Sequence, residues 1–240
     1  MPTKRTQLIN DEIYHVILRA VGNDIIFKDE NDYYRGIFSL YEFNNSISVS
    51  IQKRRQQRKK EKALTKVLSG SDPDQSIDKR DKLVELLAFC FMPNHIHLIV
   101  KQLQESGISN FIKKVGGGYA GYLNIKYKRK GHLFNKFKAI YIDGDNQFKN
   151  VLSYVWCNPI SLIEPGFKEN GIKSKEKVLK FLIEEYRWSS FFDCIGKNNF
   201  PSIISKNCIT EIIGDENICK QEVSNWINYK MRNDFYTVLE

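Results

Sequence analysis

The sequence predicts an α+β protein in which helices pack against one face of a mainly antiparallel β-sheet. Segments that alternate in polarity every second residue, as strands do, are interleaved with segments that have the longer repeat of amphipathic helices. Their order is strand, helix, insertion, a β-rich unit, helix, strand, helix and a helical tail. This order fits one α+β domain with a C-terminal helical extension.

The N-terminal part supplies the first strand and helix. Residues 12–20, EIYHVILRA, alternate well enough for a strand, with His15 between Ile13 and Ile17 on one face. Residues 29–45 have apolar side chains at helical spacing, and Asp29 or Asn31 can cap that helix. A basic insertion follows at about residues 52–80, where apolar residues become rare, and we expect it to be partly disordered or helical.

The middle of the chain returns to regular structure. Residues 82–102 form a β-rich unit with a tight break at the sequence MPN, and residues 107–131 have helical spacing. The glycine triplet Gly116–Gly118 weakens this helix and indicates a bend or a close backbone approach. Residues 132–142 are strand-like, with lysines interleaved.

The last predicted element of the sheet domain is a helix over residues 145–158. Asp145 can cap its N-terminus, and Pro159 should end or kink it. After the composition changes at about residue 168, short helical segments alternate with polar loops. We therefore expect a catalytic domain over residues 1–166 and a helical extension over residues 167–240.

Composition limits the classes of function. The net charge of +9 favours a polyanionic partner such as nucleic acid. Five scattered cysteines without a C-x-x-C pair argue against disulfides and zinc fingers. The sequence has no apolar run of membrane-spanning length and no secretory signal, so we expect a cytoplasmic, nucleoid-associated protein. Phosphate-binding loops of the Walker or dinucleotide type and a G-x-S-x-G elbow are also missing.

Two of the four histidines, His95 and His97, stand two residues apart in an apolar stretch. Alternate residues of a strand share a face, so both imidazoles point the same way, about 7 Å apart along the strand. They can converge on one divalent metal ion if both are neutral. The alternative is two histidines on a solvated sheet face or satisfied in the core, and the spacing alone does not decide between these interpretations.

The predicted helix over residues 145–158 offers a third ligand. Tyr154 and Asn158 lie one turn apart on the flank of its apolar stripe. Asn158 presents an amide oxygen, and Tyr154 presents a phenol that can reach a group bound to the metal ion. Spacing alone favours the structural alternative, in which Tyr154 is a packing aromatic and Asn158 ends the helix before Pro159.

A basic and aromatic stretch follows the glycine triplet. Cations can follow phosphates while rings stack on bases, as in proteins that bind single-stranded or hairpin DNA. The alternative is an ordinary solvated edge with buried aromatic rings. The candidate DNA-binding residues are Lys126, Lys128, Arg129, Lys130, Lys136 and Lys138.

Several motifs resemble those of the single-tyrosine HUH transposases, specifically the REP-associated branch and its IS200-like relatives. They follow one another along the chain in the same order as in that family. The resemblance spans about residues 12–190. The individually specific motifs are M-P-N-H-x-H and Y-x-x-x-N-P. The matching segments are YHVILRAVGNDIIFKDENDYYRGIFSL (14–40), FMPNHIHLIV (91–100), GHLFNKFKAIYID (131–143), YVWCNPI (154–160) and YRWSS (186–190).

The resemblance implies a ferredoxin-like or RRM-like fold and an enzyme that cleaves and joins DNA strands. It implies His95, His97 and Asn158 as ligands of Mg²⁺ or Mn²⁺, with Tyr154 as the nucleophile that forms a 5′-phosphotyrosyl intermediate. The implied partner is single-stranded or hairpin DNA, and a homodimer is left open. The sequence departs from the family's pattern in two places, and both leave the choice of substrate open. The basic insertion is long, and FNKFKA lacks the arginine and small residue often found in that segment.

Two other functions stay open. A domesticated protein of the same fold would bind nucleic acid without cleaving it. A metal-dependent hydrolase would use the two histidines without a covalent step. Tyr119 and Tyr122 are the rival nucleophiles within the first interpretation.

Overall fold

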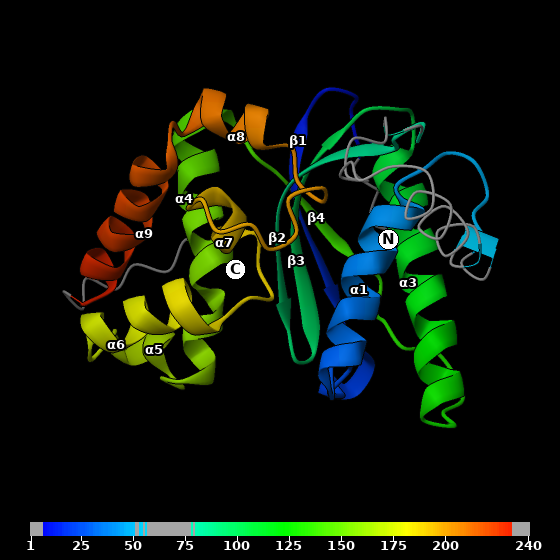
Figure 1. Cartoon of the computed structure of the whole chain (residues 1–240), viewed down its shortest axis with the longest axis horizontal. Coiled ribbons are helices and arrows are strands. Elements are labelled where there is room, and N and C mark those ends of the chain that lie inside the picture. The colour runs from blue at the N-terminus through cyan, green and yellow to red at the C-terminus, as the bar shows by residue number, and fades with distance from the viewer. Residues whose placement is uncertain (1–6, 51–52, 55, 57–77, 79, 232–240) are drawn as a thin grey trace, which may run out of the picture.

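A four-stranded antiparallel sheet with the strand order β2-β3-β1-β4 lies at the centre of the molecule (Figure 1). The structure is a computed structural model that describes residues 7–50, 53–54, 56, 78 and 80–231. The predicted basic insertion lies largely outside these residues. The strands are β1 (Ile13–Arg19), β2 (Val84–Met92), β3 (His95–Gln102) and β4 (Lys138–Tyr141).

The connections confirm the predicted fold class. The order β1, α1, β2, β3, α3, β4 with this strand arrangement is the split β-α-β topology of ferredoxin-like domains. The β-rich unit is a hairpin whose turn is Pro93-Asn94, so the predicted break at MPN is confirmed. The turn is held to the rest of the fold because Ala20 N–H donates to Asn94 O and Ile26 N–H to Pro93 O.

Helices α1 (Glu30–Phe43) and α3 (Gly107–Lys126) cover one face of the sheet (Figure 1). Asp29 caps α1, as predicted, in a reciprocal capping box with Asp32. The glycine triplet does not interrupt α3. At Gly118, a Cβ atom would lie 2.2 Å from the ring of Phe43, so the close approach of α3 to α1 requires glycine there.

The opposite face is covered by α4 (Gly144–Cys157). Its N-cap is Asp143, so the predicted cap at Asp145 is wrong: the helix begins at Gly144, which has a φ of +74°, and Asp145 lies in the first turn. The α-helix ends before Pro159, as predicted, and continues as the 3₁₀ helix η3 (Asn158–Leu162). Another 3₁₀ turn, η1 (Val21–Asn23), follows β1.

The tail is helical, as expected, and packs on the α4 side of the sheet (Figure 1). Its segment 188–190 runs along the outer edge of β2, where Phe91 N–H donates to Trp188 O and Ser190 N–H donates to Phe89 O. Its elements are α5 (Phe167–Asn170), α6 (Lys175–Lys180), the π-helical turn η4 (Phe181–Glu185), α7 (Phe191–Cys194), α8 (Lys206–Ile212) and α9 (Glu216–Met231).

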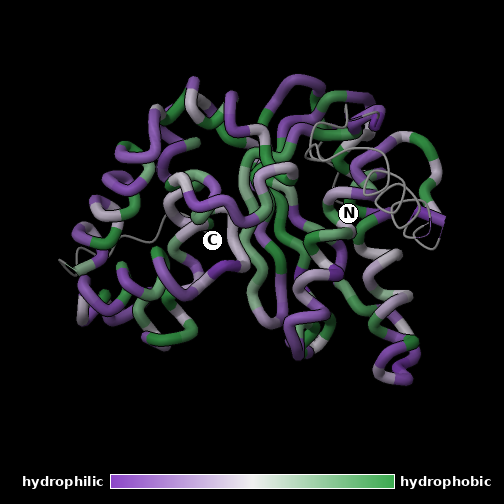
Figure 2. Tube along the Cα trace, in the orientation of Figure 1, coloured by the Kyte–Doolittle hydropathy of each residue, from purple (hydrophilic) through white to green (hydrophobic). Residues whose placement is uncertain are grey.

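Hydrophobic residues concentrate in the sheet and on the inner sides of the helices (Figure 2). Buried side chains from β1 to α9 belong to one continuous core. The division into two domains at residue 166 stays a prediction. Within the described residues, no helix has the length and hydrophobicity needed to cross a membrane.

Candidate active site

Three of the four histidines meet on the sheet face that α4 covers. In the antiparallel register, His97 stands opposite Ile17 and His95 opposite Arg19, so these side chains share a face. His15 lies two residues before Ile17 and therefore points the same way. The flanking residues Ile96 and Leu98 are buried on the other face, which confirms the predicted alternation. The strand pairing therefore places three imidazoles under α4.

A chain of hydrogen bonds links two of these histidines to the C-terminal end of α4. His15 Nε2 lies 2.9 Å from His97 Nδ1, and Asn158 Nδ2 lies 3.1 Å from His97 Nε2. All three residues are buried. The amide N–H of Asn158 can only donate, so His97 Nε2 accepts, and a neutral His97 then carries its proton on Nδ1. His97 therefore donates to His15, which is neutral with its proton on Nδ1.

His95 has a defined tautomer as well. Its Nδ1 lies 2.6 Å from Asn94 Oδ1, which can only accept, so Nδ1 carries the proton and Nε2 keeps its lone pair. The ring centroids of His95 and His97 are 4.8 Å apart. Both histidines thus have their Nε2 atoms as acceptors, which is the state in which an imidazole binds a metal ion.

The three imidazoles are held neutral by their surroundings. Burial lowers the pKa of His15 to about 4. Burial, followed by the positive charges of Arg19 and Lys168, lowers the pKa of His95 to about 3. The pKa of His97 is well below its usual value, first because of burial and then because of the neighbouring histidines and cations. The site is therefore cationic at its rim and uncharged at its histidines.

Tyr154 is half-buried beside the histidines. Its ring is edge-on to His97, at 5.6 Å between centroids, and to His15, at 6.0 Å. The ammonium of Lys168, from α5, donates a hydrogen bond of 3.2 Å to the phenol oxygen and lies 5.2 Å from the ring centroid. Helix α5, the first helix of the tail, thus places a cation beside Tyr154.

The donor set fits a divalent cation. His95 and His97 offer imidazole nitrogens. Asn158, whose Nδ2 faces His97 Nε2, would offer its amide oxygen once the side-chain amide turns over. The amide oxygen suits Mg²⁺ and Mn²⁺, and the two imidazoles favour Mn²⁺ of this pair. So few protein ligands leave positions for phosphate oxygens. Among the described residues, no three His, Cys, Asp or Glu side chains are arranged to hold a metal ion. The candidate set of metal ligands therefore needs Asn158 as its third member. His15 contacts the other ring nitrogen of His97, Nδ1.

The predicted DNA-binding cations do not all have the same surroundings. Lys126 forms ion pairs of 2.7 Å with Asp29 and Asp32, and Arg129 pairs at 2.7 Å with Asp24. The other four, Lys128, Lys130, Lys136 and Lys138, are exposed. Lys138 stands opposite Ile17 in the register and so shares the face of the histidines. Their role in DNA binding stays a prediction.

The rival tyrosines lie on the other side of the sheet. Tyr119 donates its hydroxyl to Ile26 O at 2.7 Å, and Tyr122 donates to Asp32 Oδ1 at 3.0 Å. Both come from α3, which packs on the face opposite the histidines. Of the tyrosines considered from the sequence, only Tyr154 is beside the histidines.

Two residues of the site were not predicted. The sequence predicts the correct face of the first strand for His15 but no role in the site. The available signal was that three of the chain's four histidines lie in strands, where alternate residues share a face. Lys168 has no sequence signal, because its contact with Tyr154 depends on how the chain turns after η3.

Fold and site together define an α+β protein with buried histidines and an asparagine amide beside a half-buried tyrosine on one sheet face. The family described as "Transposase IS200 like" matches the chain over residues 48–158, a range that includes His95, His97, Tyr154 and Asn158. Over that range, a little under half of its length, the chain is similar to this family of transposases. No curated protein sequence matches it significantly.

One solved structure with similarity to the chain is described as "Structure of the REP associates tyrosine transposase bound to a REP hairpin". The identity is 12% and the TM-score 0.43, over 85% of this chain and 92% of that chain. A likeness of this degree supports no statement about the substrate or mechanism of the present chain.

Proposed function

We propose that this chain is a divalent-metal-dependent transposase that cleaves and rejoins single-stranded or hairpin DNA through a 5′-phosphotyrosyl intermediate. The observation that supports this proposal best is the convergence of Tyr154 with His97 and Asn158 on one face of the sheet. The similarity of residues 48–158 to the IS200-like transposases favours DNA as the substrate. The cations at the rim favour the approach of a phosphodiester.

His95, His97 and Asn158 would hold Mg²⁺ or Mn²⁺. The bound ion would polarise the scissile phosphodiester and offset its negative charge. The protein's part is to keep both imidazoles neutral with Nε2 unprotonated, which the burial of the site and the bonds to Asn94 and His15 favour. The hydrogen bond from Asn158 to His97 Nε2 would give way to the metal ion.

Tyr154 would attack the phosphorus atom. A tyrosine hydroxyl with an ordinary pKa of about 10 is a poor nucleophile at neutral pH and needs activation. Lys168 donates to the phenol oxygen, so it would stabilise negative charge there as the proton leaves. The attack breaks the bond to the 3′ oxygen and leaves the 5′ phosphate on Tyr154. A 3′-hydroxyl of another strand reverses the step, and the phenol oxygen then leaves, so joining needs no nucleotide hydrolysis.

The test is covalent capture of DNA. The protein is incubated with hairpin DNA that has single-stranded flanks, in Mn²⁺, and the adduct is measured on a denaturing gel. We expect an adduct with the native chain and with Tyr122→Phe, which lies on the opposite face, and none with Tyr154→Phe. An adduct that persists in Tyr154→Phe would exclude this nucleophile.

A DNA-binding protein of the same fold that does not cleave is the second candidate. The observation in its favour is that His97 Nε2 already has a hydrogen-bond partner in Asn158, so the site is satisfied without a metal. This candidate predicts tight, metal-independent DNA binding and no adduct under any condition. A hydrolase without a covalent step predicts instead that Tyr154→Phe still cuts DNA. A homodimer stays a prediction, to be checked by the mass of the protein in solution.

A further inference from the structure

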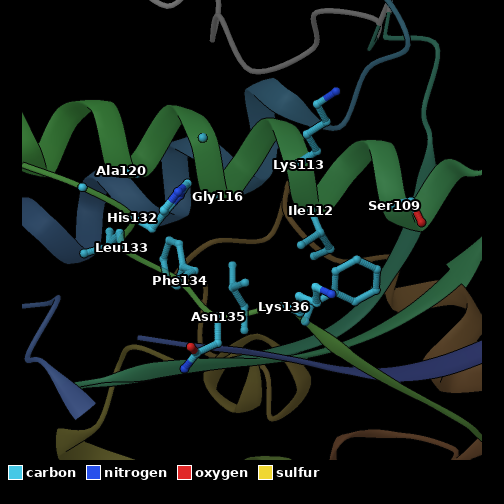
Figure 3. Close-up of a pocket in the computed structure, with 14 residues that line it drawn as sticks. Ser109, Ile112, Lys113, Gly116, Ala120, His132, Leu133, Phe134, Asn135 and Lys136 are labelled. Atoms are coloured by element: carbon cyan, nitrogen blue, oxygen red, sulfur yellow. The ribbon is translucent and has the colours of Figure 1, made fainter. Parts of the chain in front are cut away.

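A pocket of about 420 Å³ opens between α3 and the extended segment 131–137, on the sheet face opposite the histidines (Figure 3). Leu18 of β1 forms part of its wall. No part of the proposed cleavage mechanism uses this pocket. Its volume is within the range of pockets that bind small molecules, roughly 300–1,000 Å³.

The walls of the pocket suit a flat ring. On the helix side, Gly116 and Gly117 present backbone only, and no atom lies within 4 Å of the position that a Cβ of Gly117 would take. On the facing segment, the half-buried rings of Phe134 and Phe137 line the space. A planar, aromatic ligand can therefore lie against the helix backbone and contact the rings.

Two lysines line the same pocket. Lys113 of α3 and Lys136 of the facing segment both line the pocket and are exposed. Polar groups from Ser109 and His132 are also part of its lining. An apolar slot with positive charge beside it is the combination by which proteins hold single-stranded nucleic acid, since rings contact the base and cations contact the backbone.

The pocket and the candidate active site share the end of β1. Leu18 lines the pocket, and the next residue, Arg19, points to the other face, where it stands opposite His95. Asn135 of the pocket wall donates its N–H to Arg19 O at 2.9 Å. The pocket and the candidate active site therefore lie on opposite faces of the sheet at the same end of β1.

We propose that this pocket binds one unpaired nucleobase of the DNA, on the strand that leads to the site of cleavage. The inference rests on the proposed function for the identity of the strand. It adds a base-binding site, away from the chemistry, that holds a nucleotide flanking the scissile phosphodiester.

Gly117→Leu tests the proposal, because Gly117 lines the pocket and its Cβ position has no atom within 4 Å, so we expect the larger side chain to narrow the pocket. Gly121→Leu is the matched control: it lies one turn further along α3, is exposed, also has no atom near its Cβ position and does not line the pocket. Both substitutions improve helix propensity, so neither should lower the melting temperature. Both are introduced with Tyr154→Phe, so that only binding is measured.

The probes are a deoxythymidine oligomer and an abasic deoxyribose-phosphate oligomer of the same length, titrated by fluorescence anisotropy. We expect Gly117→Leu to weaken binding of the deoxythymidine oligomer by at least about fivefold, the lower end of one base stack. Binding of the abasic oligomer should be unchanged, and Gly121→Leu should change neither.

Three results would overturn the proposal that the pocket binds a base. They are equal effects of the two leucine variants, equal effects on the two oligomers, and no binding of the deoxythymidine oligomer by the parent protein. The cleavage assay is separate. If the native chain forms no adduct while the Gly117→Leu effect is found, the pocket stands and the proposed cleavage fails.

Discussion

His15 connects β1 to the candidate metal site because it accepts the Nδ1–H of His97. A partner on the far nitrogen of a metal-binding histidine fixes its tautomer and orientation, and the loss of such a partner costs about 10–100-fold in metal affinity. We therefore expect His15→Ala to weaken Mn²⁺ binding by that factor in isothermal titration calorimetry. His15→Gln, which keeps an acceptor, should recover part of it.

His132, the exposed histidine of the segment after α3, serves as control for this measurement. His132→Ala should leave the Mn²⁺ affinity unchanged. If His15→Ala binds Mn²⁺ as tightly as the native chain, His15 has no role in positioning His97.

The ammonium group of Lys168 donates a hydrogen bond to the hydroxyl of Tyr154. We expect Lys168→Met to slow formation of the tyrosyl adduct and its rejoining by about tenfold or more, because both steps place negative charge on the phenol oxygen. Mn²⁺ affinity should stay the same, and Lys168→Arg should retain part of the rate. Single-turnover kinetics measure both steps.

Lys173→Met, at an exposed position of the same tail, is the matched control. It removes an equal charge without the contact to Tyr154. Equal rate losses in the two variants would reduce the effect of Lys168 to general electrostatic attraction of DNA.

At the scale of elements, the segment 188–190 closes the edge of β2. Ser190 is its anchor: the buried Oγ accepts hydrogen bonds of 3.1 Å from Phe89 N–H and from the indole N–H of Trp156. The YRWSS motif therefore has a structural role in this chain, joining the tail to both β2 and α4. An open strand edge would otherwise expose unpaired backbone groups.

Ser190→Ala removes the acceptor of both N–H groups. Each buried donor left without a partner costs about 1–3 kcal/mol, so with two donors we expect the free energy of unfolding to fall by about 2–6 kcal/mol in urea denaturation. Ser202→Ala, exposed in the same tail, should change it by less than about 0.5 kcal/mol. A Ser190→Ala protein as stable as the native chain would show that water replaces the hydroxyl.

At the scale of the whole molecule, the buried histidines make stability depend on pH. The pKa of His15 is lowered to about 4 and that of His95 to about 3, whereas an unfolded histidine titrates at about 6.5. Between these values the unfolded chain binds more protons than the folded one, so the free energy of unfolding falls as the pH falls below about 6.5. Above that pH their contribution is constant.

We expect a slope of up to about 1.4 kcal/mol per pH unit for each of these histidines in the metal-free protein, measured by urea unfolding in EDTA between pH 7 and 5. His15→Gln should reduce the slope by the share of one histidine. A free energy of unfolding that does not change over this range would mean that protons reach the histidines without unfolding.

By itself, the sequence determined the order of the elements, the shared face of His95 and His97, the cap at Asp29 and the end of α4 before Pro159. These follow from local rules, because alternation, capping and proline act over a few residues. The same local rules brought Tyr154 and Asn158 onto one side of a helix, although they could not say which sheet face that helix would cover.

Only the tertiary structure decided that α4 covers the face opposite α1 and α3, so that Tyr154 meets the histidines while Tyr119 and Tyr122 do not. It also decided that His15 lies behind His97, that Lys168 reaches Tyr154, and that residues 188–190 pair with β2. Each is a contact between segments far apart in the chain. Such contacts depend on strand order and on how helices pack, which no local pattern of one sequence contains.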